Sequence, residues 1–135
     1  IDPDHGGRES LAELIQEHGD LPPTAIAETG GGGEHYFFRH PGENVGNRAN
    51  MRPGIDVRGD GGYIVAPASL HIKGKYRWKP GHGPHECELA DIPDSLLNEI
   101  LRRKDTSAIA DSSAKHSGGN DLSANVSEQL NKYVE

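Results

Sequence analysis

Two aspartates occupy positions at which a carboxylate is expected to bind a cation. Asp2 stands at the end of an expected extended segment, and Asp56 stands between the apolar residues Ile55 and Val57 of an expected strand. A carboxylate among apolar strand residues is costly unless water or a cation solvates it. Mg²⁺ prefers carboxylate oxygens, and acids from neighbouring strands can hold metal ions that assist phosphoryl or nucleotidyl transfer. The simpler alternative is that Asp56 lies on a solvated strand face.

A run of four glycines, residues 30–33, precedes an apolar stretch at 35–38. Glycine lets backbone N–H groups turn toward an anion and lets a nucleotide come close, so Gly32 and Gly33 are candidate phosphate contacts. The run is not a P-loop, because no Gly-Lys-Ser/Thr sequence follows it. A flexible hairpin tip is the alternative.

Three further side chains are spaced so that they share strand faces with one another or with Asp56. His35 and Arg39 are four residues apart, and Arg58 follows Asp56 by two. Even spacing places strand residues on the same face. Histidine and arginine together can clamp phosphate oxygens. The alternatives are two solvent-facing polar residues and an exposed ion pair of little value.

A second group of candidate ligands follows in one loop. His82, His85 and Cys87 offer three potential zinc ligands, and Asp91 or His71 could supply a fourth. Spacing of this kind is unspecific, so a zinc site remains only an alternative.

Composition limits the class of protein. The chain has 135 residues, 33% hydrophobic residues, 18 glycines and a mean hydropathy of −0.72, which predicts one thin core. One cysteine allows no disulfide framework and favours a reducing cytoplasm. No apolar stretch approaches the ~18 residues of a membrane span.

The charge is unevenly distributed. The net charge is −7, yet residues 35–79 hold eight lysines and arginines against three acids. A local basic face can bind polyphosphate even when the whole chain is acidic.

Periodicity predicts the elements that position these residues. Leu11, Leu14 and Ile15 mark one face of a helix over 8–18, and Asp94 begins a second helix expected to reach Lys104. Strands are expected at 24–29, 35–38, 55–57 and 63–66, with a further short strand at 75–78. Residues 43–53 are expected as a polar loop, and Asp60-Gly61-Gly62 as a hairpin turn. The order is typical of an α+β fold.

Three runs of sequence, residues 1–7, 29–38 and 53–67, carry a family resemblance. In order and spacing they closely resemble the bifunctional DNA primase/polymerase (prim-pol) domain of the archaeo-eukaryotic primase superfamily. The resemblance covers roughly Ile1 to Lys104. It implies an RRM-like antiparallel sheet with flanking helices, whose N-terminal part is expected to be missing. Residues 105–135 are then expected to be a polar linker to a downstream domain.

The resemblance also implies roles for individual residues. Asp2 matches the second acid of the family's first motif, whose first acid would lie one residue before Ile1. Gly33-Glu34-His35 matches the small-x-His motif, whose histidine contacts the phosphates of the incoming nucleotide. Ile55-Asp56 matches the third motif, so Asp2 and Asp56 would hold Mg²⁺ or Mn²⁺. Ala68 departs from the family pattern, which usually has a proline there.

The implied activity is template-directed nucleotidyl transfer by a DNA primase/polymerase. The expected partners are a DNA template and primer, nucleoside triphosphates, and a helicase or primase-associated domain, in replication of a plasmid, phage or other mobile element. The expected compartment is the cytoplasm, away from membranes. Two alternatives stay open: a non-catalytic RRM-like nucleic-acid-binding module or degenerate polymerase fragment, and a zinc-dependent domain.

Overall fold

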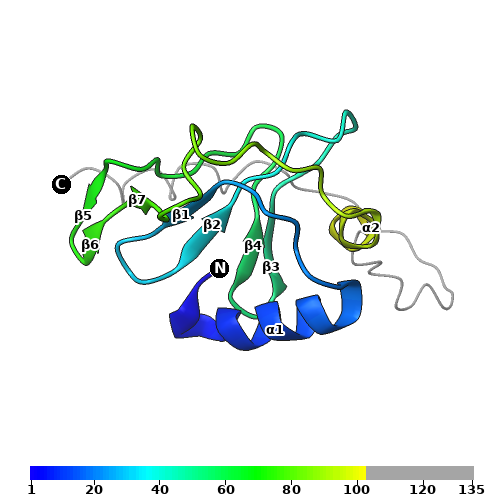
Figure 1. Cartoon of the computed structure of the whole chain (residues 1–135). Coiled ribbons are helices and arrows are strands. Elements are labelled where there is room, and N and C mark those ends of the chain that lie inside the picture. The colour runs from blue at the N-terminus through cyan, green and yellow to red at the C-terminus, as the bar shows by residue number, and fades with distance from the viewer. Residues whose placement is uncertain (103–135) are drawn as a thin grey trace, which may run out of the picture. The chain divides into compact units, whose positions relative to one another are not determined.

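A computed structural model describes residues 1–102 as two helices and short antiparallel strands (Figure 1). The α+β class predicted from the sequence is therefore confirmed. The strands form a three-stranded sheet and two two-stranded sheets. The linker predicted at 105–135 lies outside the described residues, as do residues 103 and 104 of the helix predicted to reach Lys104. At Arg102 that helix has already ended.

Helix α1, Gly7–His18, agrees with the predicted helix and begins one residue earlier. Leu14 is buried on its inner face. The helix ends at Gly19, whose φ of 87° is easy for glycine and whose N–H donates to the Ile15 carbonyl at 2.8 Å. A 3₁₀ turn, η1 (Pro3–His5), leads into the helix.

The three-stranded sheet has β1 (Ile26–Glu28) between β2 (Glu34–Tyr36) and β7 (Arg77–Trp78). Ala27 faces His35 on one neighbouring strand and Trp78 on the other, and both pairings are antiparallel. Thr24, directly before β1, is fully buried. Its hydroxyl donates to the Phe37 carbonyl and accepts the Ala90 N–H, which closes the two flanking segments onto the sheet.

The second sheet is a hairpin that the sequence analysis missed. Residues 48–52 form β3 (Arg48–Arg52), which pairs with β4 (Ile55–Val57) across a turn at Gly54, whose φ is 67°. The polar loop predicted at 43–53 is therefore wrong from residue 48 onward. Only Met51 of β3 is buried, and the pairing register shifts within the strand. The sequence therefore shows no regular alternation of apolar and polar residues that would predict this strand.

The return strand predicted at 63–66 is also wrong. A turn does form at Asp60-Gly61, but there Asp60 contacts Val45. The Asp60 N–H donates to the Val45 carbonyl at 2.6 Å, and the Asp60 carboxylate accepts the Val45 N–H at 2.9 Å. The chain beyond runs exposed, with Tyr63 88% accessible. The sequence therefore predicted the turn correctly but not the segment that Asp60 contacts.

The third sheet is a small hairpin that we call the ribbon, residues 68–76. It contains β5 (Leu70–His71) and β6 (Gly74–Lys75), and Ala68 and Ser69 pair with Tyr76 at its base. The single strand predicted at 75–78 is thus divided between β6 and β7.

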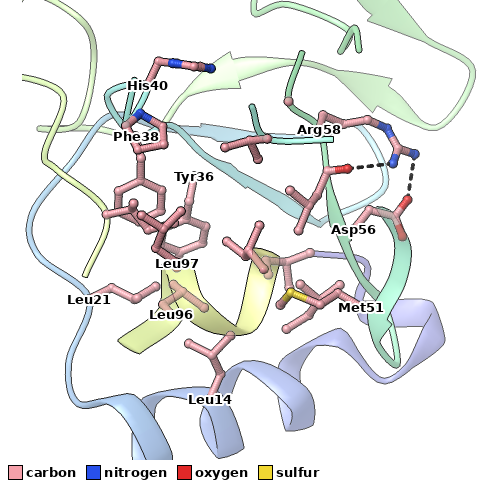
Figure 2. A pocket seen from close by; sticks show the side chains of 18 of the residues that line it. Leu14, Leu21, Tyr36, Phe38, His40, Met51, Asp56, Arg58, Leu96 and Leu97 are labelled. Carbon is pink, nitrogen blue, oxygen red and sulfur yellow. Dashed lines mark hydrogen bonds and ion pairs between the residues drawn. The ribbon is translucent and has the colours of Figure 1, made fainter. Parts of the chain in front are cut away.

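The core lies between the β3–β4 hairpin and the two helices, the second being α2 (Asp94–Leu101). Its buried members are Leu14, Met51, Ile55 and Leu96. The packing is incomplete: an apolar hollow of about 240 Å³ remains beside these residues (Figure 2). The thin core expected from the composition corresponds to this small cluster.

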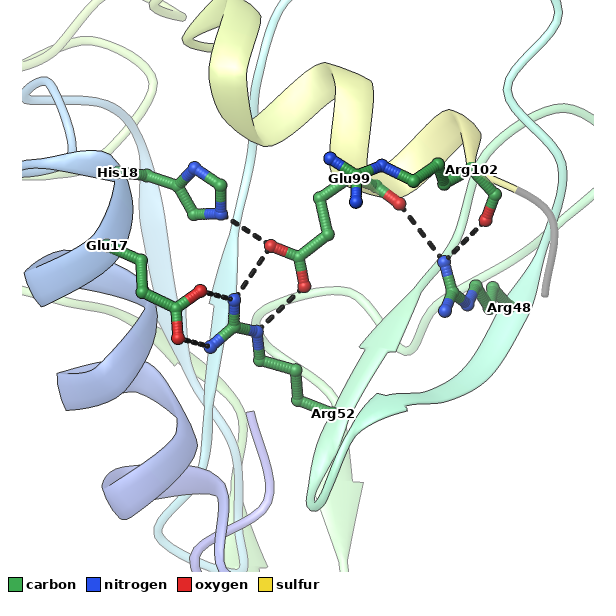
Figure 3. Close-up of polar contacts among 6 residues, drawn as sticks. All are labelled: Glu17, His18, Arg48, Arg52, Glu99 and Arg102. Atoms are coloured by element: carbon green, nitrogen blue, oxygen red, sulfur yellow. Dashed lines mark hydrogen bonds and ion pairs between the residues drawn. The ribbon is translucent and has the colours of Figure 1, made fainter.

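One ionic cluster ties β3 to both helices (Figure 3). The Arg52 guanidinium contacts Glu99 at 2.7 Å and Glu17 at 2.6 Å, while His18 contacts Glu99 at 2.5 Å. The side chains of Arg52 and Glu99 are only 14% and 19% accessible. Arg48 adds hydrogen bonds to carbonyls at the end of α2.

We expect Arg52→Met to lower the free energy of unfolding by about 2–3 kcal/mol, because it leaves Glu99 half-buried without its guanidinium. Urea denaturation measures the change. Arg39→Met is the matched control, since the Arg39–Asp91 pair is 56% and 78% exposed and should contribute less than about 1 kcal/mol. Equal losses in the two variants would contradict this account of the cluster.

The same cluster predicts a dependence of stability on pH. Hydrogen bonding from Arg52, with a smaller contribution from His18, lowers the pKa of Glu99 from 4.5 to about 2. The stabilisation is complete above pH 4.5 and should be lost as the pH falls toward 2. Glu99→Gln should flatten this part of the stability curve. If Glu99→Gln lost stability between pH 4.5 and 2 just as the wild type does, other carboxylates would govern the acid dependence.

Candidate functional site

An open cleft of about 1050 Å³ is lined by residues 1–5, by β2 and the glycine turn before it, by Asp56 and the segment after it, and by the ribbon. Four acidic residues line it, against two permanently charged cations, Arg58 and Lys73. Such an excess of oxygen ligands favours divalent cations over bare anions. The carboxylates are Asp2, Asp4, Glu34 and Asp56.

Asp2 is placed in the cleft by backbone hydrogen bonds on both sides. Ile1 exchanges hydrogen bonds with Glu34 of β2 at 2.8 and 3.1 Å, and the Asp2 N–H donates to the Gly54 carbonyl at 2.7 Å. The first two residues therefore lie extended between β2 and the β3–β4 turn. Gly7 must be glycine here, because a Cβ atom would lie 2.5 Å from the Asp2 carbonyl.

The Asp2 carboxylate remains charged. It caps η1 by accepting the Asp4 N–H at 3.0 Å, and its other oxygen contacts His5 Nδ1 at 2.8 Å. The hydrogen bond from His5 is the main reason that the pKa of Asp2 lies below its usual value. The side chain is half exposed, so a cation can reach it.

Asp56 lies on β4 and faces the same cleft. The Arg58 guanidinium binds its Oδ2 at 2.8 Å (Figure 2). The Asn50 N–H donates to its Oδ1 at 2.8 Å. The prediction that Asp56 and Arg58 share one face is thus confirmed. The pair is 44% and 39% exposed, so it can exchange for other partners at little cost.

His35 lies on β2 with one ring nitrogen lacking a partner. Its Nδ1 is buried and makes no hydrogen bond with any residue of 1–102. The ring packs near Tyr76 and Phe37, with centroid distances of 5.9 and 6.4 Å. Burial, and secondarily the amine of Ile1, lowers the pKa of His35. A buried nitrogen without a partner is costly.

The glycine run forms a closed turn. The N–H of Gly32 donates to the Thr29 carbonyl at 3.0 Å, and that of Gly33 donates to the Thr29 hydroxyl at 2.9 Å. The N–H groups of Gly32 and Gly33 are therefore not free to bind an anion. The glycine run had led us to predict that they contact phosphate. Gly33 lines the cleft, where a Cβ atom would lie 2.3 Å from the Ile1 carbonyl. Gly32 lines a separate hollow.

Arg39 is not brought to the cleft. Strand β2 ends at Tyr36, so the even spacing from His35 no longer fixes a common face. Arg39 instead borders the apolar hollow and pairs with Asp91 at 2.7 Å.

The candidate zinc ligands are not assembled either. His82 Nδ1 hydrogen-bonds the Thr24 carbonyl at 2.9 Å, which makes it part of the sheet's support. Within residues 1–102, one group of three potential metal ligands comes together, formed by Glu17, His18 and Glu99. The Arg52 guanidinium already binds both of these glutamates.

Sequence reasoning missed the part of the cleft formed by the ribbon. His71, Lys73 and Tyr76 all line the cleft. A signal was present: residues 61–85 contain no acid and four lysines or arginines. Spacing alone gave no reason to single out Lys73 among them.

Comparison with known proteins identifies a family. Neither helix of residues 1–102 is long and apolar enough to cross a membrane. No curated protein and no solved structure matches the chain. The family model described as bifunctional DNA primase/polymerase, N-terminal, matches residues 1–95, which include Asp2, His35 and Asp56. The chain therefore belongs to the bifunctional DNA primase/polymerase family.

Proposed function

We propose that this chain carries the metal- and nucleotide-binding face of a DNA primase/polymerase that performs template-directed nucleotidyl transfer. The observation that carries the proposal is that Asp2, His35 and Asp56, from three separate segments, line one cleft. Their order and types match a family whose substrates are DNA and nucleotides.

Asp2 and Asp56 would hold the divalent ions. Both present hard carboxylate oxygens, both are accessible, and the carboxylates of the cleft outnumber its permanent cations. When bound, Mg²⁺ or Mn²⁺ supplies activation of a hydroxyl and neutralises charge on a phosphoryl group. The resemblance places a further acid before Ile1, and we propose that it shares this site.

His35 and Arg58 would hold the triphosphate. His35 lines the cleft, burial lowers its pKa, and it can donate one ring N–H to a phosphate oxygen. Arg58 is bound to Asp56 at 2.8 Å, and a cation on Asp56 would release the guanidinium for the phosphates. Arg39, predicted for the same task, stands outside the cleft and is the weaker candidate.

The template would follow the basic part of the chain. Four cations and no acid between residues 61 and 85 suit a polyanion, and the exposed Tyr63 can stack on an unpaired base. We propose that the chain serves replication of a plasmid, phage or other mobile element in the cytoplasm. A helicase or primase-associated domain would then act beside it, joined through residues 105–135.

One observation favours a second function. Asp56 pairs with Arg58 and Asp2 pairs with His5, so both proposed metal ligands already have protein partners. A non-catalytic module that binds nucleic acid through the same basic segment would have this property. In such a module, Asp56→Asn would leave DNA binding intact and would affect no nucleotide site.

Calorimetric titration with Mn²⁺ and a non-hydrolysable deoxynucleoside triphosphate separates the two functions. It should be run on this chain and on a version extended upstream by the acid-bearing strand that the resemblance implies. We expect Asp56→Asn and His35→Ala each to weaken nucleotide binding by about tenfold or more, because each removes a charge-assisted contact.

Asp91→Asn is the control, since Asp91 pairs with Arg39 away from the cleft. It should leave nucleotide affinity unchanged. If neither version of the wild-type protein binds nucleotide while both bind DNA, the polymerase proposal fails and the binding module takes its place.

A further inference from the structure

Lys73 stands at the tip of the ribbon and reaches into the cleft. Its Nζ lies 3.2 Å from Asp4 Oδ2, which links the ribbon to η1. Its aliphatic stem passes over the glycine turn, where a Cβ atom on Gly31 would lie 3.7 Å from Lys73 Cδ. The ammonium group thus lies between the glycine turn and the acidic N-terminal residues.

The backbone beneath this side chain is fixed. Gly30 and Gly74 touch so closely that a Cβ atom on Gly30 would lie 2.6 Å from the Gly74 carbonyl oxygen. The Lys73 N–H donates to His71 Nδ1 at 3.2 Å, and His71 pairs with Gly74 across the hairpin. A closely packed base therefore carries a long side chain that is 61% exposed.

The present partner of Lys73 holds it weakly. The Lys73–Asp4 pair is exposed on both sides, at 61% and 60%, and such pairs contribute little. A nucleotide phosphate offers more negative charge and several strong acceptor oxygens. The ammonium can therefore exchange Asp4 for a phosphate at little cost.

Lys73 also differs from the other cleft cation. Arg58 is bound to Asp56, a proposed metal ligand, so its release depends on a cation taking its place. Lys73 is bound to Asp4, to which no metal role has been assigned. Of the two permanent cations that line the cleft, Lys73 is the one that can move without disturbing a proposed metal ligand.

We propose that Lys73 is a triphosphate-binding residue that leaves Asp4 when a nucleotide enters the cleft and pairs with its phosphates. This inference rests on the proposed function, because it assumes that the cleft binds a nucleotide. It adds the ribbon as a separate element of the nucleotide site, beside the segments that supply Asp2, His35 and Asp56.

Nucleotide titration in the presence of Mn²⁺ and without DNA tests the inference, in whichever version of the chain binds nucleotide. We expect Lys73→Met to weaken binding by about tenfold, because it removes a charge-assisted contact, and Lys73→Arg to restore most of the affinity. Arg8→Met is the control. Arg8, near the start of α1, lines an adjoining hollow and not the cleft, so its loss should leave nucleotide affinity unchanged.

Asp4→Asn distinguishes two roles of Lys73: binding phosphate, and acting as a structural tether that holds the ribbon to η1. It removes the carboxylate of the Lys73–Asp4 ion pair and leaves the lysine in place. If Lys73 binds phosphate, Asp4→Asn keeps or improves nucleotide affinity while Lys73→Met loses it. Equal losses in both variants would overturn the inference in favour of a tether. Unchanged affinity in Lys73→Met, with a wild type that binds, would overturn it and leave the proposed function standing. A wild type that binds no nucleotide would overturn both.

Discussion

The candidate site depends on the hydrogen bonds that hold Ile1 and Asp2 extended between Glu34 and Gly54. These contacts join two sheets that do not otherwise pair in residues 1–102, and they put Asp2 near His35 of β2 and Asp56 of β4. They also require a backbone approach that only glycine permits at residues 7 and 33. The chemistry of the cleft therefore rests on backbone pairing at the very start of the chain.

Electrostatics adds a second constraint. Each permanent cation of the cleft is bound to a carboxylate, Arg58 to Asp56 and Lys73 to Asp4. These pairs balance the charge when no ligand is present and are exposed enough to open. The Arg52 cluster, by contrast, is half-buried and connects β3 to both helices, so it serves the framework. Similar residue types thus have different tasks because their burial differs.

Sequence reasoning predicted the helices, β1, β2 and β4, because apolar periodicity and breaker residues are local signals. It missed β3, whose pairing depends on a turn and register that its polar residues do not reveal. It also placed a return strand at 63–66, where the structure has an exposed segment without strand pairing. Family motifs identified Asp2, His35 and Asp56. Arg39 and Lys73 show what local spacing cannot predict. Strand β2 ends before Arg39, which lies outside the cleft, whereas the ribbon brings Lys73 into it.

The most direct test of the central claim is the location of Mn²⁺ by its anomalous scattering in crystals grown with a non-hydrolysable deoxynucleoside triphosphate. The proposed function predicts a peak bonded to the carboxylates of Asp2 and Asp56, with nucleotide phosphates beside His35. A peak at Glu17, His18 and Glu99 instead, or nucleotide bound away from the cleft, would contradict it.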